Sequence, residues 1–167
     1  SHGVNRGVLK FGKTDEREEF INKLVKNNTN IKFDLYGLNG RQPIWAEEFF
    51  QILSRSRMAL NLSRGEPIKY YSSDRITQII GNGLVTLIDE KTGYRDFFEN
   101  DEMIFYKNVE DLSEKIEKIS RDEKLRKLIG RKGKQKYLKY FNSTLVANFI
   151  INKTFDISNR KNPIWEN

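Results

Sequence analysis

The feature that most limits the fold of this 167-residue chain is a regular alternation of short apolar runs with longer helical patterns. Apolar runs of this length, rich in β-branched and aromatic residues, are typical of strands buried on both faces of a parallel sheet. The runs occupy residues 7–11, 31–37, 58–63, 84–89 and 103–106. We therefore expect an α/β domain with a doubly wound, Rossmann-like parallel sheet of about five strands flanked by helices.

The segments between these runs carry the period of amphipathic helices. The pattern predicts helices over 15–26, 44–55 and 73–80, a short helical piece at 94–99, and a helix that places Val109, Leu112, Ile116 and Ile119 on one face. Two more helices are expected at 121–140 and 143–155. A single domain would then span residues 3–157, between Ser1-His2, which is typical of an expression scar, and a polar tail at 158–167 in which we expect only Trp165 to pack.

The composition excludes several kinds of chemistry. The chain has no cysteine, which excludes disulfides and thiolate nucleophiles. Its one histidine is His2, in the suspected expression scar, so we also exclude Ser-His catalysis. We find no D-x-D pair or histidine cluster in a loop, and we expect neither a metal nor a cofactor. No apolar run approaches the roughly 20 residues of a membrane span, and nothing signals secretion, so we expect a soluble cytoplasmic protein.

The formal net charge of +7 favours anionic ligands. Its sign does not choose among phosphates, nucleic acid and acidic headgroups. Much of the excess lies at residues 124–139, in a run whose plainest interpretation is a solvated helix face.

The longest loop between a predicted strand and the next helix runs from residue 63 to 73. Ligands of doubly wound sheets bind at this end of the strands, so the loop is the first place to look for a site. Ser72 and Ser73 are good N-cap candidates for the helix DRITQIIG. A helix start with exposed N–H groups, together with Lys69 and Arg75, would make an anion site.

A plain structural interpretation of this helix start stays open, in which Arg75 simply pairs with Asp74 or Asp89. Familiar phosphate motifs do not help, because only Gly12 follows the first strand where a dinucleotide fold needs G-x-G-x-x-G. The segment Gly81-Asn82-Gly83 follows a predicted helix instead of a strand, and is better explained as a helix C-cap.

From about Lys32 to Ile119 the order of elements resembles the C-terminal domain of GT-B glycosyltransferases (glycosyl transferases group 1), particularly the branch with spore-maturation-type enzymes. The stretches that carry the resemblance are a strand ending in YG, LSRSRMALNLS, SSDRITQIIGNGLVTLID and YRDFFENDEMIFYKNVEDLSEKI. In the third stretch Arg75 matches the family arginine, Gln78 the glutamate and Gly83 the glycine. In the fourth, Glu102 stands at the family's glutamate, where we expect a structural cap or ion pair.

The resemblance implies a domain that binds the nucleotide-sugar donor of a glycosyl transfer. The residues it places at the donor diphosphate are Arg75, Ser72, Ser73 and Lys69. Those it places at the ribose and base are Gln78, Gly37, Arg41 and Trp45. Either Arg41 or Trp45 would stack on the base, and the alternative for Trp45 is a half-buried aromatic at a helix start.

Tyr70 and Gln78 depart from the family pattern, because many retaining members carry carboxylates at both positions. We therefore expect donor binding and assign no catalytic residue. In such enzymes a preceding N-terminal domain binds the acceptor, so this domain alone should turn over little or nothing. The alternative function is a non-catalytic α/β module that binds nucleic acid or a protein partner through basic helices, although no nucleic-acid-binding motif is present.

Overall fold

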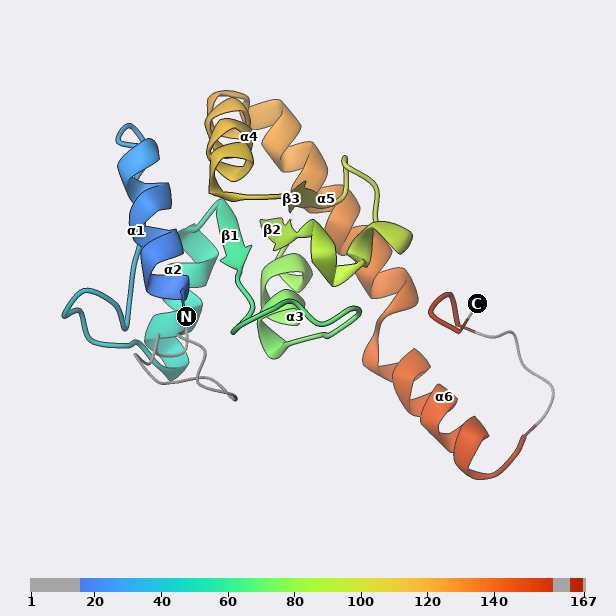
Figure 1. The fold of residues 1–167 in the computed structure, drawn as a ribbon. Coiled ribbons are helices and arrows are strands. Elements are labelled where there is room, and N and C mark those ends of the chain that lie inside the picture. The colour runs from blue at the N-terminus through green and yellow to red at the C-terminus, as the bar shows by residue number, and fades with distance from the viewer. Residues whose placement is uncertain (1–15, 158–162, 167) are drawn as a thin grey trace.

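The computed structural model describes residues 16–157 and 163–166, and the helices and strands follow one another much as the sequence predicts (Figure 1). They are α1 (Arg17–Asn27), α2 (Ala46–Arg55), β1 (Met58–Asn61), α3 (Asp74–Gly81), β2 (Val85–Asp89), the 3-10 helices η2 (Glu90–Thr92) and η3 (Tyr94–Asp96), β3 (Ile104–Tyr106), α4 (Val109–Arg121), α5 (Glu123–Tyr140) and α6 (Ser143–Thr154). The expected strand at 7–11, the expected scar Ser1-His2 and most of the tail lie outside the described residues.

The strands form a parallel sheet in the order β1-β2-β3. The prediction of about five strands is not confirmed, because residues 31–37 form no strand. Ile31 and Phe33 of this segment still pack against the buried core, as their apolar character requires. A strand also needs a neighbour to complete its backbone hydrogen bonds, and this segment makes no ladder with β1, β2 or β3.

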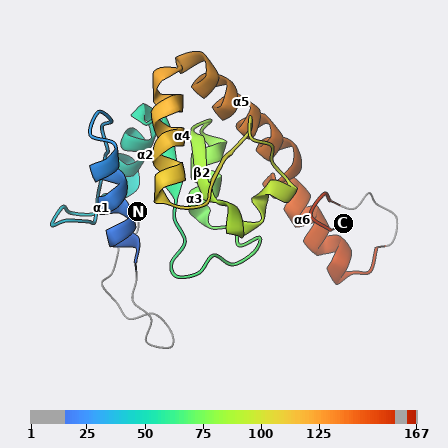
Figure 2. The same ribbon diagram turned by 45° about the horizontal axis from the view of Figure 1, so that its top comes forward.

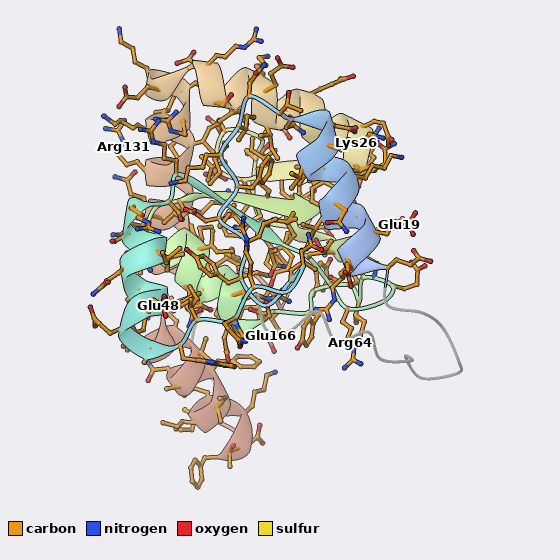
Figure 3. All side chains as sticks on the ribbon, turned by 90° about the vertical axis from the view of Figure 1, so that its left-hand side faces the viewer. Glu19, Lys26, Glu48, Arg64, Arg131 and Glu166 are labelled. Carbon is orange, nitrogen blue, oxygen red and sulfur yellow. The ribbon has the colours of Figure 1, made fainter. Side chains whose placement is uncertain are left out.

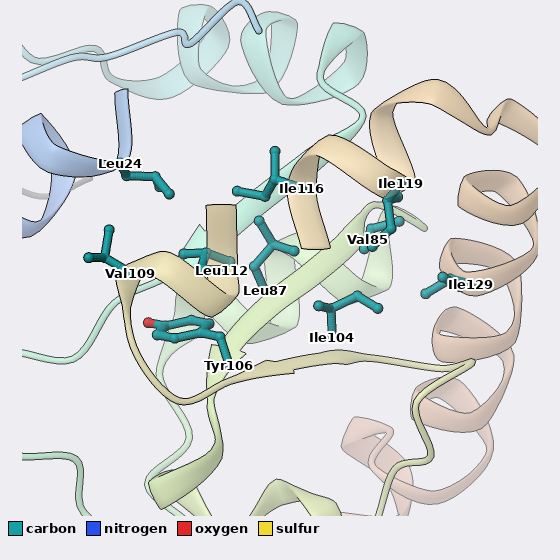
Figure 4. Packing of buried hydrophobic residues seen from close by; sticks show 10 residues of the cluster. All are labelled: Leu24, Val85, Leu87, Ile104, Tyr106, Val109, Leu112, Ile116, Ile119 and Ile129. Atoms are coloured by element: carbon teal, nitrogen blue, oxygen red, sulfur yellow. The ribbon is translucent and has the colours of Figure 1, made fainter. Parts of the chain in front are cut away.

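Helices cover both faces of the sheet, as a buried parallel sheet requires. One face packs mainly against α1 and α4, through the cluster that Figure 4 shows around Leu87, Tyr106 and Leu112. The other face packs against α3 and α5, where Ile88 and Phe105 belong to a second cluster. Figure 2 shows α4 and α5 on different sides of the strands. Charged side chains such as Glu19 and Arg131 point outward from the helices (Figure 3).

Gly83 follows the C-cap of α3 and turns the chain into β2. Its φ of 76° lies in the left-handed region. The Gly83 N–H donates to Ile80 O at 3.0 Å and the Leu84 N–H to Ile79 O at 3.2 Å. This pair of bonds is a Schellman motif, and the C-cap predicted from the glycine pair is confirmed.

Two glycines of α5 allow the helix to touch the backbone of neighbouring segments. A Cβ added at Gly130 would lie 2.1 Å from Gly83 O, and one added at Gly133 would lie 2.3 Å from Glu102 O. Glu102 itself accepts from the Lys136 ammonium at 2.7 Å and from the Glu99 N–H at 2.9 Å. The structural role expected for Glu102 is therefore confirmed.

The C-terminal helix α6 extends away from the sheet (Figure 1). None of its twelve residues is buried. Trp165, from the tail, stacks on Phe141 with ring centroids 5.4 Å apart, so this tryptophan packs as expected. Within residues 16–157 and 163–166, no helix has the length and apolar character needed to cross a membrane.

Candidate functional site

A pocket of about 290 Å³ lies where α2 faces the start of α3 and β1. Most of its wall is apolar and includes the rings of Phe49 and Phe50. The sequence-predicted residues Trp45, Arg75 and Gln78 all line it, although they come from two segments about thirty residues apart. The fold thus brings a predicted base contact, a predicted diphosphate contact and a predicted ribose contact into one cavity.

Trp45 is an exposed aromatic at the edge of this pocket. It is the N-cap residue of α2, with extended backbone angles, and 62% of its surface is exposed. The half-buried aromatic considered as an alternative is therefore wrong for this residue. An exposed aromatic ring at the edge of a pocket is of the kind on which a flat ligand group can stack.

Arg75 is a half-buried cation in the first turn of α3. Burial and then the charge of Arg17 lower its pKa, whereas Tyr71 and Tyr106 act in the opposite direction. Among the residues that the structure describes, no carboxylate contributes to this balance. A charge held in partly desolvated surroundings without a counter-ion favours an anionic ligand.

The pairing of Arg75 with Asp74 or Asp89, left open by the sequence, is not seen in the described part of the chain. Asp89 Oδ1 instead accepts the Lys91 N–H at 2.8 Å, which caps the 3-10 helix η2. Burial raises the pKa of Asp89, and the Lys91 hydrogen bond opposes this.

Tyr106 ends β3 directly opposite Asp89 in the sheet register. It is 1% exposed, and its hydroxyl has no hydrogen-bond partner among the described residues. Burial raises the pKa of Tyr106, Asp89 raises it further and Arg75 lowers it. Among the described residues, this edge of the sheet thus holds a buried hydroxyl without a hydrogen-bond partner and a guanidinium on which no carboxylate acts.

The side chains of the two serines before α3 do not hydrogen-bond to its first N–H groups. Ser73 is the N-cap residue, as expected, but its Oγ donates to Asn61 Oδ1 at 3.1 Å. Ser72 hydrogen-bonds Tyr94. Because no side chain of the described residues caps α3, its first turn can offer backbone N–H groups to a ligand.

A comparison with protein families decides the class of this domain. A family model described as glycosyl transferase-like matches residues 16–152, which run from α1 into α6. The chain belongs to this glycosyl transferase-like family. Membership indicates glycosyl transfer as the reaction class, with a sugar donor as its ligand. No curated protein and no solved structure matches the chain.

Five residues predicted at the donor site do not line the pocket of this glycosyl transferase-like domain: Ser72, Ser73, Lys69, Gly37 and Arg41. The Lys69 ammonium lies 3.5 Å from the Asp96 carboxylate. Gly37 and Arg41 belong to a turn in which the Gly37 N–H donates to Gln42 O at 3.3 Å. No contact with a ligand tests these assignments, which stay predictions.

Arg17 and Tyr106 are site candidates that the sequence interpretation missed in this glycosyl transferase-like domain. Arg17 begins α1 and Tyr106 ends β3, yet both change the pKa of Arg75, which Arg17 lowers and Tyr106 raises. The available signal was positional, because strand ends and the following helix starts meet at one edge of a parallel sheet. Within the described ranges no three acidic or histidine side chains gather as a metal site.

Proposed function

We propose that this domain binds the nucleotide-sugar donor of a GT-B glycosyltransferase of the spore-maturation-type branch. One observation carries the proposal: Arg75, half-buried and with no carboxylate acting on it among the described residues, lines the same apolar pocket as Trp45 and Gln78. A nucleotide sugar has the matching parts, which are a flat base, a hydroxylated ribose and a diphosphate.

The size of the pocket suits the nucleoside end of such a donor. Its 290 Å³ is close to the lower limit of about 300 Å³ for pockets that hold drug-sized ligands. The Trp45 ring is placed to stack on the base, while the Gln78 amide can both donate to and accept from the ribose hydroxyls. The sugar would then extend out of the pocket.

The diphosphate would lie at Arg75 and the start of α3. A guanidinium forks onto two phosphate oxygens, and the uncapped first turn adds N–H groups and the positive end of the helix dipole. The charge of Arg17 lies near enough to Arg75 to lower its pKa. Preorganised donors of this kind also stabilise a leaving diphosphate as its charge develops.

The acceptor would be held by a separate N-terminal domain of the enzyme. With a tyrosine at position 70 and an amide at position 78, the residues present explain donor binding better than turnover. We therefore propose that the domain alone binds donor and has little or no transferase activity.

The test follows binding of UDP-, GDP-, ADP- and CMP-sugars by thermal shift and ligand-observed NMR. Arg75→Gln should weaken binding about 10–150-fold, since a hydrogen bond to a charged group contributes about 1.5–3 kcal/mol. Arg121→Gln is the matched control, because Arg121 pairs with Glu117 on α4. The proposal fails if no nucleotide sugar binds, or if Arg75→Gln binds as well as the control.

The alternative function, nucleic-acid or protein binding through basic helices, gains no support from α5. Three of its six lysines pair with acidic partners: Lys127 with Glu123, Lys132 with Asp101, and Lys136 with Glu102. A helix with half of its lysines paired in this way presents less positive potential than its sequence suggests. Salt-dependent binding to oligonucleotides remains the measurement that would favour the alternative.

A further inference from the structure

The loop that leads from β1 to α3 contains a tyrosine in a backbone conformation that tyrosine avoids. Residues 68–71 form a turn in which the Tyr71 N–H donates to Ile68 O at 3.1 Å. Tyr70, the third residue of this turn, has φ 61°. Glycine or asparagine is favoured at that position, because a Cβ is strained in the left-handed region. The side chain of Tyr70 must therefore provide something that glycine would not.

Tyr70 is anchored to the η2–η3 segment by three contacts. Its hydroxyl donates to the Asp96 carboxylate. Its backbone N–H donates to Thr92 O at 2.8 Å, and its ring lies 5.1 Å from that of Phe97. Contacts from both the backbone and the side chain fix the turn in position and direction.

Lys69 and Gly93 complete the junction. The Lys69 ammonium lies 4.6 Å from the centre of the Tyr70 ring and 3.5 Å from the Asp96 carboxylate. Gly93 allows the close approach, because a Cβ there would lie 2.9 Å from both Lys69 Cγ and Tyr70 Cε1. The hydrogen bond from Tyr70 holds the pKa of Asp96 below its usual value, so the carboxylate stays charged at neutral pH.

The anchored turn continues directly into the proposed anion site. Tyr71 lies near enough to Arg75 to raise the pKa of its guanidinium. The next two residues are tied to neighbouring segments, Ser72 to Tyr94 and Ser73 to Asn61. Any movement of the turn would therefore be transmitted to the N-cap of α3 and to the guanidinium that follows it.

We propose that the hydrogen bond between Tyr70 and Asp96 is a latch that positions residues 71–75 for donor binding. The inference rests on the proposed function and adds two positioning residues to it. Neither is a catalytic residue, because each acts through the loop and through Arg75. The tyrosine found where family members carry a carboxylate thus has a role of its own.

The test compares Tyr70→Phe, which removes only the hydroxyl, with Asp96→Asn and the double variant. The probes are inorganic pyrophosphate and whichever nucleotide sugar the wild type binds. Each single change should raise the dissociation constant about five-fold or more, and the double variant should be no weaker than the singles, as for two partners in one contact. Matched controls are Tyr140→Phe and Asp101→Asn, which alter a tyrosine and a paired carboxylate away from this loop.

Tyr70→Gly separates positioning from a simple turn requirement. Glycine relieves the backbone strain, so the free domain should keep its stability, yet loss of the latch should weaken binding. Amide exchange at residues 69–73 should become faster in Tyr70→Phe and Tyr70→Gly and stay unchanged in Tyr140→Phe.

The outcomes distinguish the two proposals. A wild type that binds neither probe overturns both the proposed function and the latch. If the wild type binds and Arg75→Gln does not, while Tyr70→Phe and Tyr70→Gly bind like the wild type, only the latch is overturned. Should Tyr70→Phe fail to fold, Asp96→Asn gives the same comparison.

Discussion

Gly133→Ala in α5 would raise helix propensity but would also place a Cβ against the backbone of a neighbouring segment. A Cβ at this position would lie 2.3 Å from Glu102 O and 3.5 Å from Ile80 Cδ1. An ordinary contact begins at 3.4 Å, so the helix and the carbonyl must separate by 3.4 − 2.3 = 1.1 Å. No side-chain rotation can provide this movement, because the atom in the way belongs to the backbone.

The balance of the two effects predicts a loss of stability. Replacing glycine by alanine inside a helix is worth about 1 kcal/mol in favour of folding. Overpacking a fixed contact costs about 1–3 kcal/mol and sometimes more. We expect the upper part of that range, because Met103, next to the carbonyl, is 0% exposed and leaves no room to move. The net loss should be about 2 kcal/mol, or about 4–8 °C in Tm for a chain of this size.

Urea unfolding of Gly133→Ala and Gly81→Ala measures the difference. Gly81 is the control because it is also helical, in α3, and a Cβ there meets nothing within 4 Å. Gly81→Ala should gain up to about 1 kcal/mol, whereas Gly133→Ala should unfold at lower urea with an unchanged m value. If Gly133→Ala is as stable as the wild type, α5 does not contact the Glu102 backbone and the packing argument is refuted.

Three further changes test other parts of the structure. Trp45→Ala should weaken nucleotide-sugar binding by about 1–3 kcal/mol, the worth of stacking one base, and Trp45→Phe should lose less in the same titration. Gly83→Ala should cost about 1–2 kcal/mol in urea unfolding, because its φ of 76° penalises a Cβ even though the nearest atom is 3.6 Å away. Asp89→Asn should stabilise the domain at pH 7 and not at pH 3. The sign follows from the raised pKa of Asp89, since an acid that binds its proton more tightly when folded loses stability as pH rises through that pKa. Equal effects of Asp89→Asn at both pH values would contradict this reasoning.

Helix positions were predictable because their signals are local. The helices from α1 to α6 begin and end within two residues of the predicted bounds. Asn108, Asp122 and Asn142 each accept a hydrogen bond from the N–H three residues later, at the starts of α4, α5 and α6. Periodicity and capping involve only neighbours in the chain, so no knowledge of the fold is needed to read them.

Strand pairing and site assembly were harder to predict because they depend on which segments lie side by side. The apolar run at 31–37 correctly indicated packing but not strand pairing, since a ladder requires a partner strand. Trp45, Arg75 and Gln78 were chosen one by one, and only the fold placed them around one pocket. Arg17 and Tyr106 were missed because they approach Arg75 only at the assembled edge of the sheet.

Position 70 shows most clearly what the sequence determines and what only the tertiary structure decides. The sequence alone determined that a tyrosine stands there, at a position where the family resemblance predicts a carboxylate. Only the tertiary structure decided that Asp96, twenty-six residues later, accepts its hydrogen bond. Chain chemistry fixes which groups are present, whereas the distances and desolvation that give those groups a function arise when separate segments pack together.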